Sequence, residues 1–237
     1  VLAQIGGLAY ITDQGYVQNP SIRNREPESI PWPAWDLVPI NNYLDNNIAL
    51  NNNGIRTMPM VASRGCPYTC NFCSNEQMWG TLYRMRDPED IVNELKYYKK
   101  VYKIHGFDLA DLTFITNRKW FLQFASLLKE SNLNLRWDIA NTRSEAIDEE
   151  VIKALAESGC YSLCLAPDSG SEDQVIDMDK RVDLNHVSKC IRTMQKYPID
   201  LKVNFMMGSP NETHLDIIKT IFYGIKVSFL GAATVSF

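Results

Sequence analysis

The chain has 237 residues, of which 45% are hydrophobic and 22% are charged, and its formal net charge is −4. This composition indicates a globular protein with a sizeable core, and it excludes a disordered chain and a basic footprint for sequence-independent nucleic-acid binding. Six cysteines in a chain of this length do not form a secreted disulfide framework. Free thiols favour a reducing compartment, so we expect a cytoplasmic location.

Residues 1–54 differ from the rest of the chain in their prolines, asparagines and short apolar runs. A small hairpin is predicted around residues 13–15. The proline-rich residues 30–39 predict an extended arm, because proline disfavours helix. The chain begins without Met and stops on an apolar run. We therefore expect a fragment, in which residues 1–54 are the end of an upstream domain plus a linker and residues 55–237 form the core domain.

From residue 55 onward, apolar runs of strand type alternate with helical patterns. Asp87, followed by Pro88, is a strong helix start, and Asp148 is another candidate N-cap. Besides the helix that begins at Asp87, we expect helices at residues 119–130, 148–159, 184–197 and 213–227, and strands at residues 58–63, 109–115, 135–140, 161–166, 201–207 and 232–237. Lys226 interrupts the apolar C-terminal segment, which predicts helix and strand rather than a membrane span.

Six such alternations predict a parallel α/β sheet with right-handed crossovers. The sheet is either doubly wound or closed toward a barrel. Both architectures place functional residues at the carboxyl ends of the strands.

The first expected strand runs directly into three cysteines, Cys66, Cys70 and Cys73, with the spacing Cys-x3-Cys-x2-Cys. Three thiolates on one loop can hold three irons of a cubane iron–sulfur cluster and leave the fourth iron open. An open metal position is typical of a catalytic site. A zinc knuckle or a ferredoxin-type carrier needs a fourth ligand nearby, but the next candidates, His105 and Cys160, are remote.

This spacing, followed by alternating strands and helices, resembles the radical S-adenosylmethionine (SAM) superfamily. The resemblance implies a partial (β/α)6 barrel of the TIM type, with a [4Fe–4S] cluster on Cys66, Cys70 and Cys73 and SAM at the fourth iron. It also implies reductive cleavage of SAM to a 5′-deoxyadenosyl radical. The cofactor would supply this chemistry and the protein would orient it.

Residues 79–84 and 86–94, together with the proline-rich arm, are similar to the cobalamin-associated branch of this superfamily. Residues 1–20 then resemble the end of a cobalamin-binding domain. The cobalamin motif Asp-x-His-x-x-Gly does not occur in the chain. The resemblance therefore implies cobalamin only for a longer parent protein, in which it serves methylation or rearrangement of a substrate.

Four candidate SAM contacts come from the resemblance. Phe72 is similar to a family aromatic near the cluster and adenine, and Asp111 resembles the acceptor for the SAM amino group. Residues 166–171 are similar to a family Glu-Ser-Gly-Ser segment, with Asp168 in place of Glu and followed by Ser169. The alternatives are a core aromatic for Phe72 and tight-turn or capping roles for the others.

Three more candidates lie farther along the strand ends. Met206 and Gly208 belong to a segment that resembles the family element beside the adenine, although the same residues also make a strand-to-helix turn. Arg143, just after the third strand, is placed to meet a carboxylate at the mouth of the barrel. An ion pair with Glu145 or Asp148 is the alternative.

Two other functions remain open: a cobalamin-independent radical SAM enzyme such as a methylthiotransferase, and a non-catalytic metal-binding or electron-transfer module. As partners, the resemblance implies an electron donor such as flavodoxin or ferredoxin and a small-molecule substrate of unknown identity. Cys160, Cys164 and Cys190 are expected to be core thiols, because a buried cysteine behaves as a small hydrophobe.

Overall fold

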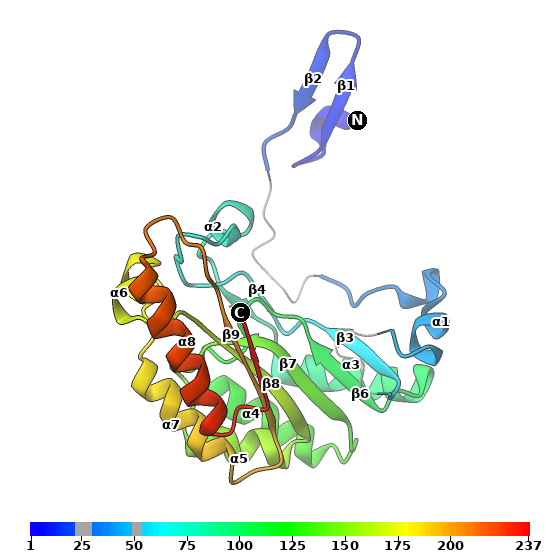
Figure 1. Cartoon of the computed structure of the whole chain (residues 1–237). Coiled ribbons are helices and arrows are strands. Elements are labelled where there is room, and N and C mark those ends of the chain that lie inside the picture. Colours follow the sequence, from blue (N-terminus) through cyan, green and yellow to red (C-terminus); the bar gives the residue numbers. More distant parts are fainter. Residues whose placement is uncertain (22–29, 49–53) are drawn as a thin grey trace. The chain divides into compact units, whose positions relative to one another are not determined.

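The computed structural model describes residues 1–21, 30–48 and 54–237, and its contacts divide the chain into two compact units, Val1–Pro31 and Trp32–Phe237. The first unit contains the predicted hairpin, with β1 (Ala9–Thr12) antiparallel to β2 (Gly15–Gln18) (Figure 1). A 3-10 turn, Leu2–Gln4, precedes it. The side chain of Asn19 donates hydrogen bonds to the carbonyls of Leu2 and Ile5. These bonds tie the start of the chain to the end of the hairpin.

The second unit begins earlier than the boundary expected at residues 54 and 55. Trp32 donates its indole N–H to Asp90 at 3.0 Å, and Trp35 donates to the Tyr98 hydroxyl at 2.9 Å. Both acceptors lie on α3 (Pro88–Tyr102). The proline-rich arm, with η3 (Trp35–Leu37) and α1 (Ile40–Asp45), therefore belongs to the core unit. Two tryptophans thus anchor the arm to α3, and the assignment of residues 1–54 to the end of an upstream domain and a linker stays a prediction. Residues 49–53, within the predicted linker, are outside the described residues, as are residues 22–29.

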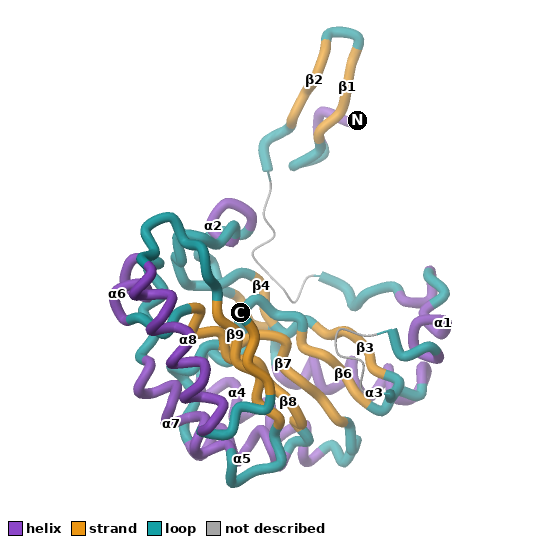
Figure 2. Tube along the Cα trace, viewed as in Figure 1, coloured by secondary structure: helices purple, strands orange, loops and turns teal. Residues whose placement is uncertain are grey.

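One six-stranded parallel sheet forms the centre of the second unit (Figure 2). Its strands are β3 (Thr57–Met60), β6 (Gly106–Leu109), β7 (Arg136–Thr142), β8 (Cys160–Asp168), β9 (Asp200–Phe205) and β10 (Thr234–Ser236). Neighbours in the sheet follow the order of the chain. A doubly wound sheet would reverse its order at a switch point. The sequential order is that of a (β/α) barrel, so the expected partial barrel is confirmed.

The long helices pack side by side in chain order, α3 against α4, α4 against α5 and α5 against α7 (Figures 1 and 2). Their bounds are α4 (Arg118–Glu130), α5 (Glu149–Glu157), α7 (Leu184–Met194) and α8 (His214–Phe229). The predicted starts are confirmed by caps: Asp87 accepts from the Glu89 N–H and Asp148 from the Val151 N–H. No helix of the described residues is long and apolar enough to cross a membrane.

Two predicted strands differ from those observed. The first is shorter and is followed by β4 (Ser63–Arg64), which pairs with β5 (Arg84–Met85). The second, expected at residues 109–115, is β6 and ends at Leu109. Phe114 and Ile115 are buried although they lie outside the strand. Phe114 packs edge-on against Trp120 and Trp137, among other aromatic rings. The apolar run therefore reflects burial of a loop rather than extension of the strand.

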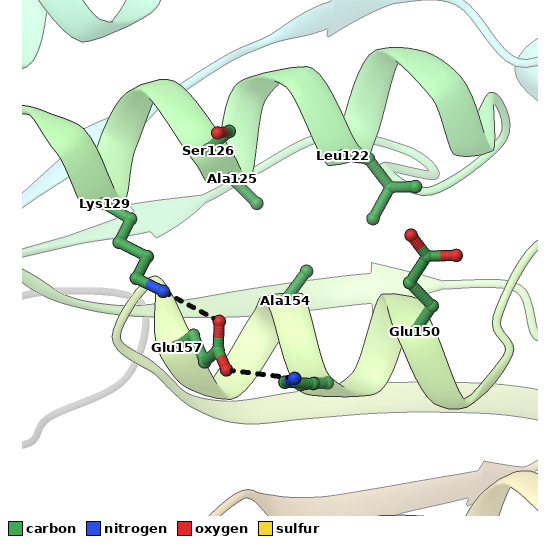
Figure 3. A pocket seen from close by; sticks show the side chains of 8 residues that line it. Leu122, Ala125, Ser126, Lys129, Glu150, Ala154 and Glu157 are labelled. Atoms are coloured by element: carbon green, nitrogen blue, oxygen red, sulfur yellow. Dashed lines mark hydrogen bonds and ion pairs between the residues drawn. The ribbon is translucent and has the colours of Figure 1, made fainter.

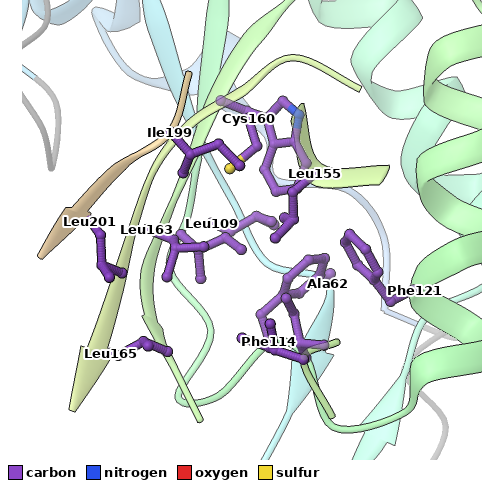
Figure 4. Packing of buried hydrophobic residues seen from close by; sticks show 14 of the residues in the cluster. Ala62, Leu109, Phe114, Phe121, Leu155, Cys160, Leu163, Leu165, Ile199 and Leu201 are labelled. Carbon is purple, nitrogen blue, oxygen red and sulfur yellow. The ribbon is translucent and has the colours of Figure 1, made fainter. Parts of the chain in front are cut away.

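A continuous core lies between the sheet and the helices (Figure 4). Phe107 and Trp137, from neighbouring strands, stack with ring centroids 5.5 Å apart. The three cysteines outside the loop, Cys160, Cys164 and Cys190, are buried, as predicted. The short helices α2 (Asn75–Met78) and α6 (Glu172–Asp177), which the sequence did not predict, lie in the loops at one edge of the sheet (Figure 1).

A buried ion pair joins α3 to the chain just before the cysteines. Arg86 contacts Glu94 at 2.6 Å and donates to the carbonyl of Val61 at 3.0 Å. Tyr98 donates to the other carboxylate oxygen of Glu94. Arg86 also pairs with Asp90, so it keeps one partner if Glu94 is lost.

We expect Glu94→Gln to lower the free energy of unfolding by about 2 kcal/mol, because a buried charged group then loses a partner. Urea unfolding of the apo chain measures this change. Glu130→Gln, at the exposed end of α4, is the control and should change stability by less than about 0.5 kcal/mol. Equal effects of the two substitutions would contradict a structural role for the buried pair.

Candidate iron–sulfur and SAM site

The cysteine loop begins at the carboxyl end of β3, after the short strand β4. All three cysteines are unpaired; Cys66 and Cys70 are half-buried and Cys73 is exposed. Gly65 has a φ of +81°, and a Cβ there would lie 2.1 Å from the carbonyl oxygen of Leu82. Only glycine fits such an approach. This glycine lets the loop turn closely against the strand that follows it.

The loop is held by a segment more than 100 residues away in the sequence. Thr69 donates its hydroxyl to Asp179, and the backbone N–H of Asn71 donates to the carbonyl of Met178 at 3.1 Å. The Asn71 side chain donates to the carbonyl of Asp177 at 2.6 Å. The connection between α6 and α7 thus fixes the middle of the cysteine loop.

Arg143 follows β7 directly and contacts the cysteine loop. Its guanidinium pairs with Glu145, with Nε 3.0 Å from the carboxylate, and it also donates to the carbonyl of Lys180. It covers the ring of Tyr68 at 3.8 Å, and its Nη1 lies 3.8 Å from the Sγ of Cys70. The predicted alternative, an ion pair with Glu145, is therefore present, but it is mostly buried and it contacts the cysteine loop.

Lys180 is a site residue that sequence reasoning missed. Its amine forms an ion pair with Asp168 at 2.5 Å, and it lies 5.9 Å from the centre of the Phe72 ring. Asp168 ends β8 with a φ of +65°, in the left-handed region. A lysine in a charged segment is expected to be exposed to solvent, so nothing in the sequence indicated that Lys180 would be buried at this site. The ion pair joins the end of β8 to the cysteine loop region.

Burial is the main influence on two of the loop thiols. It raises the pKa of Cys66 and of Cys70, and the charges of Lys180 and Arg143 oppose that rise at Cys70. A thiol must lose its proton to bind iron. The two cations therefore lie where they favour the anionic form of the Cys70 sulfur.

The three free thiols of the loop are the kind of donor that an iron–sulfur cluster uses. Among the described residues, no three His, Cys, Asp or Glu side chains could together hold one metal ion. A zinc ion needs its thiolate ligands at about 2.3 Å, whereas each thiolate of a cubane cluster binds a different iron. Three unpaired thiols on one loop meet the second requirement.

Asp111 is buried and contacts the residues just before the cysteine loop. Its carboxylate accepts from the backbone N–H of Ala62 at 3.1 Å and from the hydroxyl of Ser63. Burial raises its pKa to about 6, against the opposing effect of these hydrogen bonds. Asp111 thus links β6 to the residues that lead into the cysteines, and its contact with the SAM amino group stays a prediction.

The remaining candidates gather where β8 and β9 end. The hydroxyl of Ser169 is fully buried against that of Thr220, at 3.0 Å, so it serves packing with α8. The Met206 N–H donates to the carbonyl of Asp168 at 2.7 Å. Gly208 has a φ of +94° and open space where a Cβ would project. This edge therefore offers an exposed glycine and a half-buried methionine, whereas Ser169 is already engaged.

Two cavities lie away from this edge, between the outer helices. One, of about 310 Å³, lies between α4 and α5, where Lys129 pairs with Glu157 at 2.9 Å (Figure 3). Another, of about 390 Å³, lies between α5 and α7 and is lined by His186 and Cys190, among others. Neither includes a residue predicted to bind the cofactors.

Comparison with protein families gives a match to the radical SAM superfamily over residues 60–223. An uncharacterized methyltransferase of Pyrococcus horikoshii is 27% identical over 219 residues, which are 90% of this chain and 46% of that protein. An anaerobic magnesium-protoporphyrin IX monomethyl ester cyclase of Cereibacter sphaeroides is 29% identical over 217 residues, 89% of this chain and 34% of the cyclase. The chain spans less than half the length of these two relatives.

Solved structures share the fold at low sequence identity. TsrM, a radical SAM methyltransferase of Kitasatospora setae, superimposes with a TM-score of 0.75 and 17% identity, over 95% of this chain and 45% of TsrM. The cobalamin-dependent radical SAM enzyme OxsB gives a TM-score of 0.75 and 18% identity, over 94% of this chain and 32% of OxsB. At these low sequence identities, the structural similarity shows only that the chain shares the fold of these proteins.

The raised pKa of Asp111 predicts a pH dependence of stability. The folded state holds this proton more tightly than the unfolded chain, whose usual value is 3.8. The stabilisation is therefore complete below about pH 4 and is lost as the pH rises through about 6. Relative to Asp111→Asn, the wild type should lose up to about 3 kcal/mol of unfolding free energy over that range. Urea unfolding of both apo proteins at several pH values measures this loss, and a constant difference between them would contradict it.

Proposed function

The chain belongs to the radical SAM superfamily, and from that premise we propose that it cleaves SAM reductively at a [4Fe–4S] cluster held by Cys66, Cys70 and Cys73. The observation that carries this proposal is the cysteine loop itself. It presents three unpaired thiols at the carboxyl edge of a parallel sheet. No fourth protein ligand is included in the proposed set, so one iron is left for SAM.

The bound cluster would supply the electron that breaks a carbon–sulfur bond of SAM and releases a 5′-deoxyadenosyl radical. The residues of this chain hold and orient the reactants. The segment of residues 177–179 fixes the loop through Thr69 and Asn71. Arg143 and Lys180 place positive charge beside the Cys70 sulfur. The fold therefore supplies the frame on which a cluster of fixed orientation can be built.

We place the SAM nucleoside along the edge formed by Phe72, Met206 and Gly208. Phe72 is 44% exposed and Gly208 leaves open space above its backbone, so both can approach a ligand. Asp168 and Arg143 already have ionic partners in the chain, which favours a supporting role for them. Asp111 remains the proposed acceptor for the SAM amino group, with oxygens that can accept further hydrogen bonds.

The reaction that follows is proposed to be a cobalamin-dependent methylation or rearrangement of a small molecule. Similarity to a methyltransferase and to a porphyrin cyclase supports this class. Cobalamin would be held by another part of a longer protein, because the motif Asp-x-His-x-x-Gly does not occur in this sequence. An electron donor such as flavodoxin or ferredoxin and a cytoplasmic location complete the proposal.

A methylthiotransferase is the second candidate. A putative methylthiotransferase of Methanocaldococcus jannaschii is 23% identical over 239 residues, 93% of this chain. The two candidates share the cleavage of SAM and differ in the group transferred. Cobalamin dependence of the full-length protein would separate them.

The experiment is anaerobic reconstitution of the chain with iron and sulfide, followed by reduction and EPR spectroscopy with and without SAM. We expect a reduced-cluster signal that changes when SAM is added, together with formation of 5′-deoxyadenosine. Cys70→Ala should abolish both. Cys164→Ala, which removes a buried thiol outside the loop, should retain both.

A metal site or cluster that is indifferent to SAM would overturn the proposed function and support the non-catalytic alternative. Loss of the cluster in both variants would trace the effect to general destabilisation. In that case Cys73→Ala, at the most exposed thiol of the loop, decides whether the loop holds the cluster.

A further inference from the structure

Two cations lie buried against the cysteine loop, and the proposed SAM cleavage does not use them directly. The side chains of Arg143 and Lys180 are only 7% and 9% exposed. They come from different parts of the chain, Arg143 from the end of β7 and Lys180 from the connection between α6 and α7. Arg143 donates to the backbone carbonyl of Lys180, which locks the two together.

The guanidinium is aimed at a cluster ligand. Its Nη1 lies 3.8 Å from the Cys70 sulfur, within reach of an N–H to sulfur hydrogen bond. The ring of Tyr68, under the guanidinium, keeps it in this place. An arginine whose position is set by a ring, a carboxylate and a carbonyl has little freedom to turn toward another partner.

The acids that pair with these cations do not cancel their effect at the sulfur. Glu145 is 34% exposed, so solvent screens its charge more strongly than that of Arg143. Asp168 pairs with Lys180 at 2.5 Å, whereas Arg143 contacts the sulfur itself, with Nη1 3.8 Å from the Sγ of Cys70. A positive charge therefore lies in direct contact with this sulfur.

We propose that Arg143, supported by Lys180, raises the reduction potential of the cluster by donating to the Cys70 sulfur. A cluster with three thiolates gains one negative charge on reduction, and hydrogen bonds and positive charge beside a ligand sulfur stabilise the reduced form. Arg143 is then a positioning residue that tunes the cluster, rather than a ligand for the SAM carboxylate. The inference rests on the proposed cluster.

The test is the midpoint potential of the reconstituted cluster, measured without SAM by a redox titration followed by EPR. At a fixed potential, Arg143→Gln should lower the ratio of reduced to oxidised cluster about tenfold, a shift of about 59 mV to more negative potential for one electron. Arg143→Lys, which keeps the charge, should fall between wild type and Arg143→Gln. Lys196→Gln removes an exposed cation that pairs with Glu149 and should leave the potential unchanged.

Glu145→Gln provides a test of opposite sign. It removes the partly exposed counter-charge but keeps a side-chain oxygen that can accept from Arg143, and Tyr68 and the Lys180 carbonyl still hold the guanidinium, so the ratio of reduced to oxidised cluster should rise about threefold. A purely structural role for Arg143 predicts no such rise. If Arg143→Gln takes up no cluster, this variant is read together with Arg143→Lys, which keeps the charge but not the geometry of the guanidinium and should lower the potential.

An unchanged potential in a fully loaded Arg143→Gln protein overturns the inference, as does a potential that does not rise in Glu145→Gln. Effects that appear only when SAM is present would assign Arg143 to SAM binding, and they also overturn it. Failure of the proposed function is recognised separately in the wild type, either by iron and sulfide analysis that finds no [4Fe–4S] cluster or by a cluster whose EPR signal does not change when SAM is added.

Discussion

Everything at the proposed site depends on holding a short loop of three thiols in place without a fourth protein ligand. A loop of this kind has no ladder of its own to satisfy its backbone groups, so the bonds must come from elsewhere. Here the backbone N–H of Asn71 donates to the carbonyl of Met178, and side-chain contacts of Thr69 with Asp179 and of Cys70 with Arg143 add to it. Each thiol would then be available to a different iron of the proposed cluster.

The sheet explains how such distant residues meet. Because all six of its strands are parallel, their carboxyl ends lie at one edge of the sheet. β3 leads to the cysteines, β7 to Arg143 and β8 to Asp168, whose partner Lys180 returns to the loop. The topology therefore brings into contact residues that are more than 100 positions apart in the sequence. The buried cations Arg143 and Lys180 come from two further segments and complete the proposed site.

The sequence predicted what depends on local chemistry. The Asp87 and Asp148 caps confirmed two helix starts, and the alternation of elements predicted the sheet. The prediction of a strand at residues 109–115 was wrong, because the apolar residues at the end of this range are buried in a loop and not in a strand. Lys180 was missed because its burial depends on Asp168 and on the loop at once, which no spacing encodes. The sequence also did not indicate that Asp111 would accept hydrogen bonds from Ala62 and Ser63, because these residues follow a different strand.

The central claim is that one iron of the cluster takes its ligand from SAM and not from this chain. The most direct measurement is pulsed electron–nuclear double resonance on the reduced, reconstituted protein with SAM carrying ¹⁵N in its amino group. The account predicts a hyperfine coupling between the cluster and the labelled nitrogen. A fully loaded cluster with no coupling to the label would contradict it.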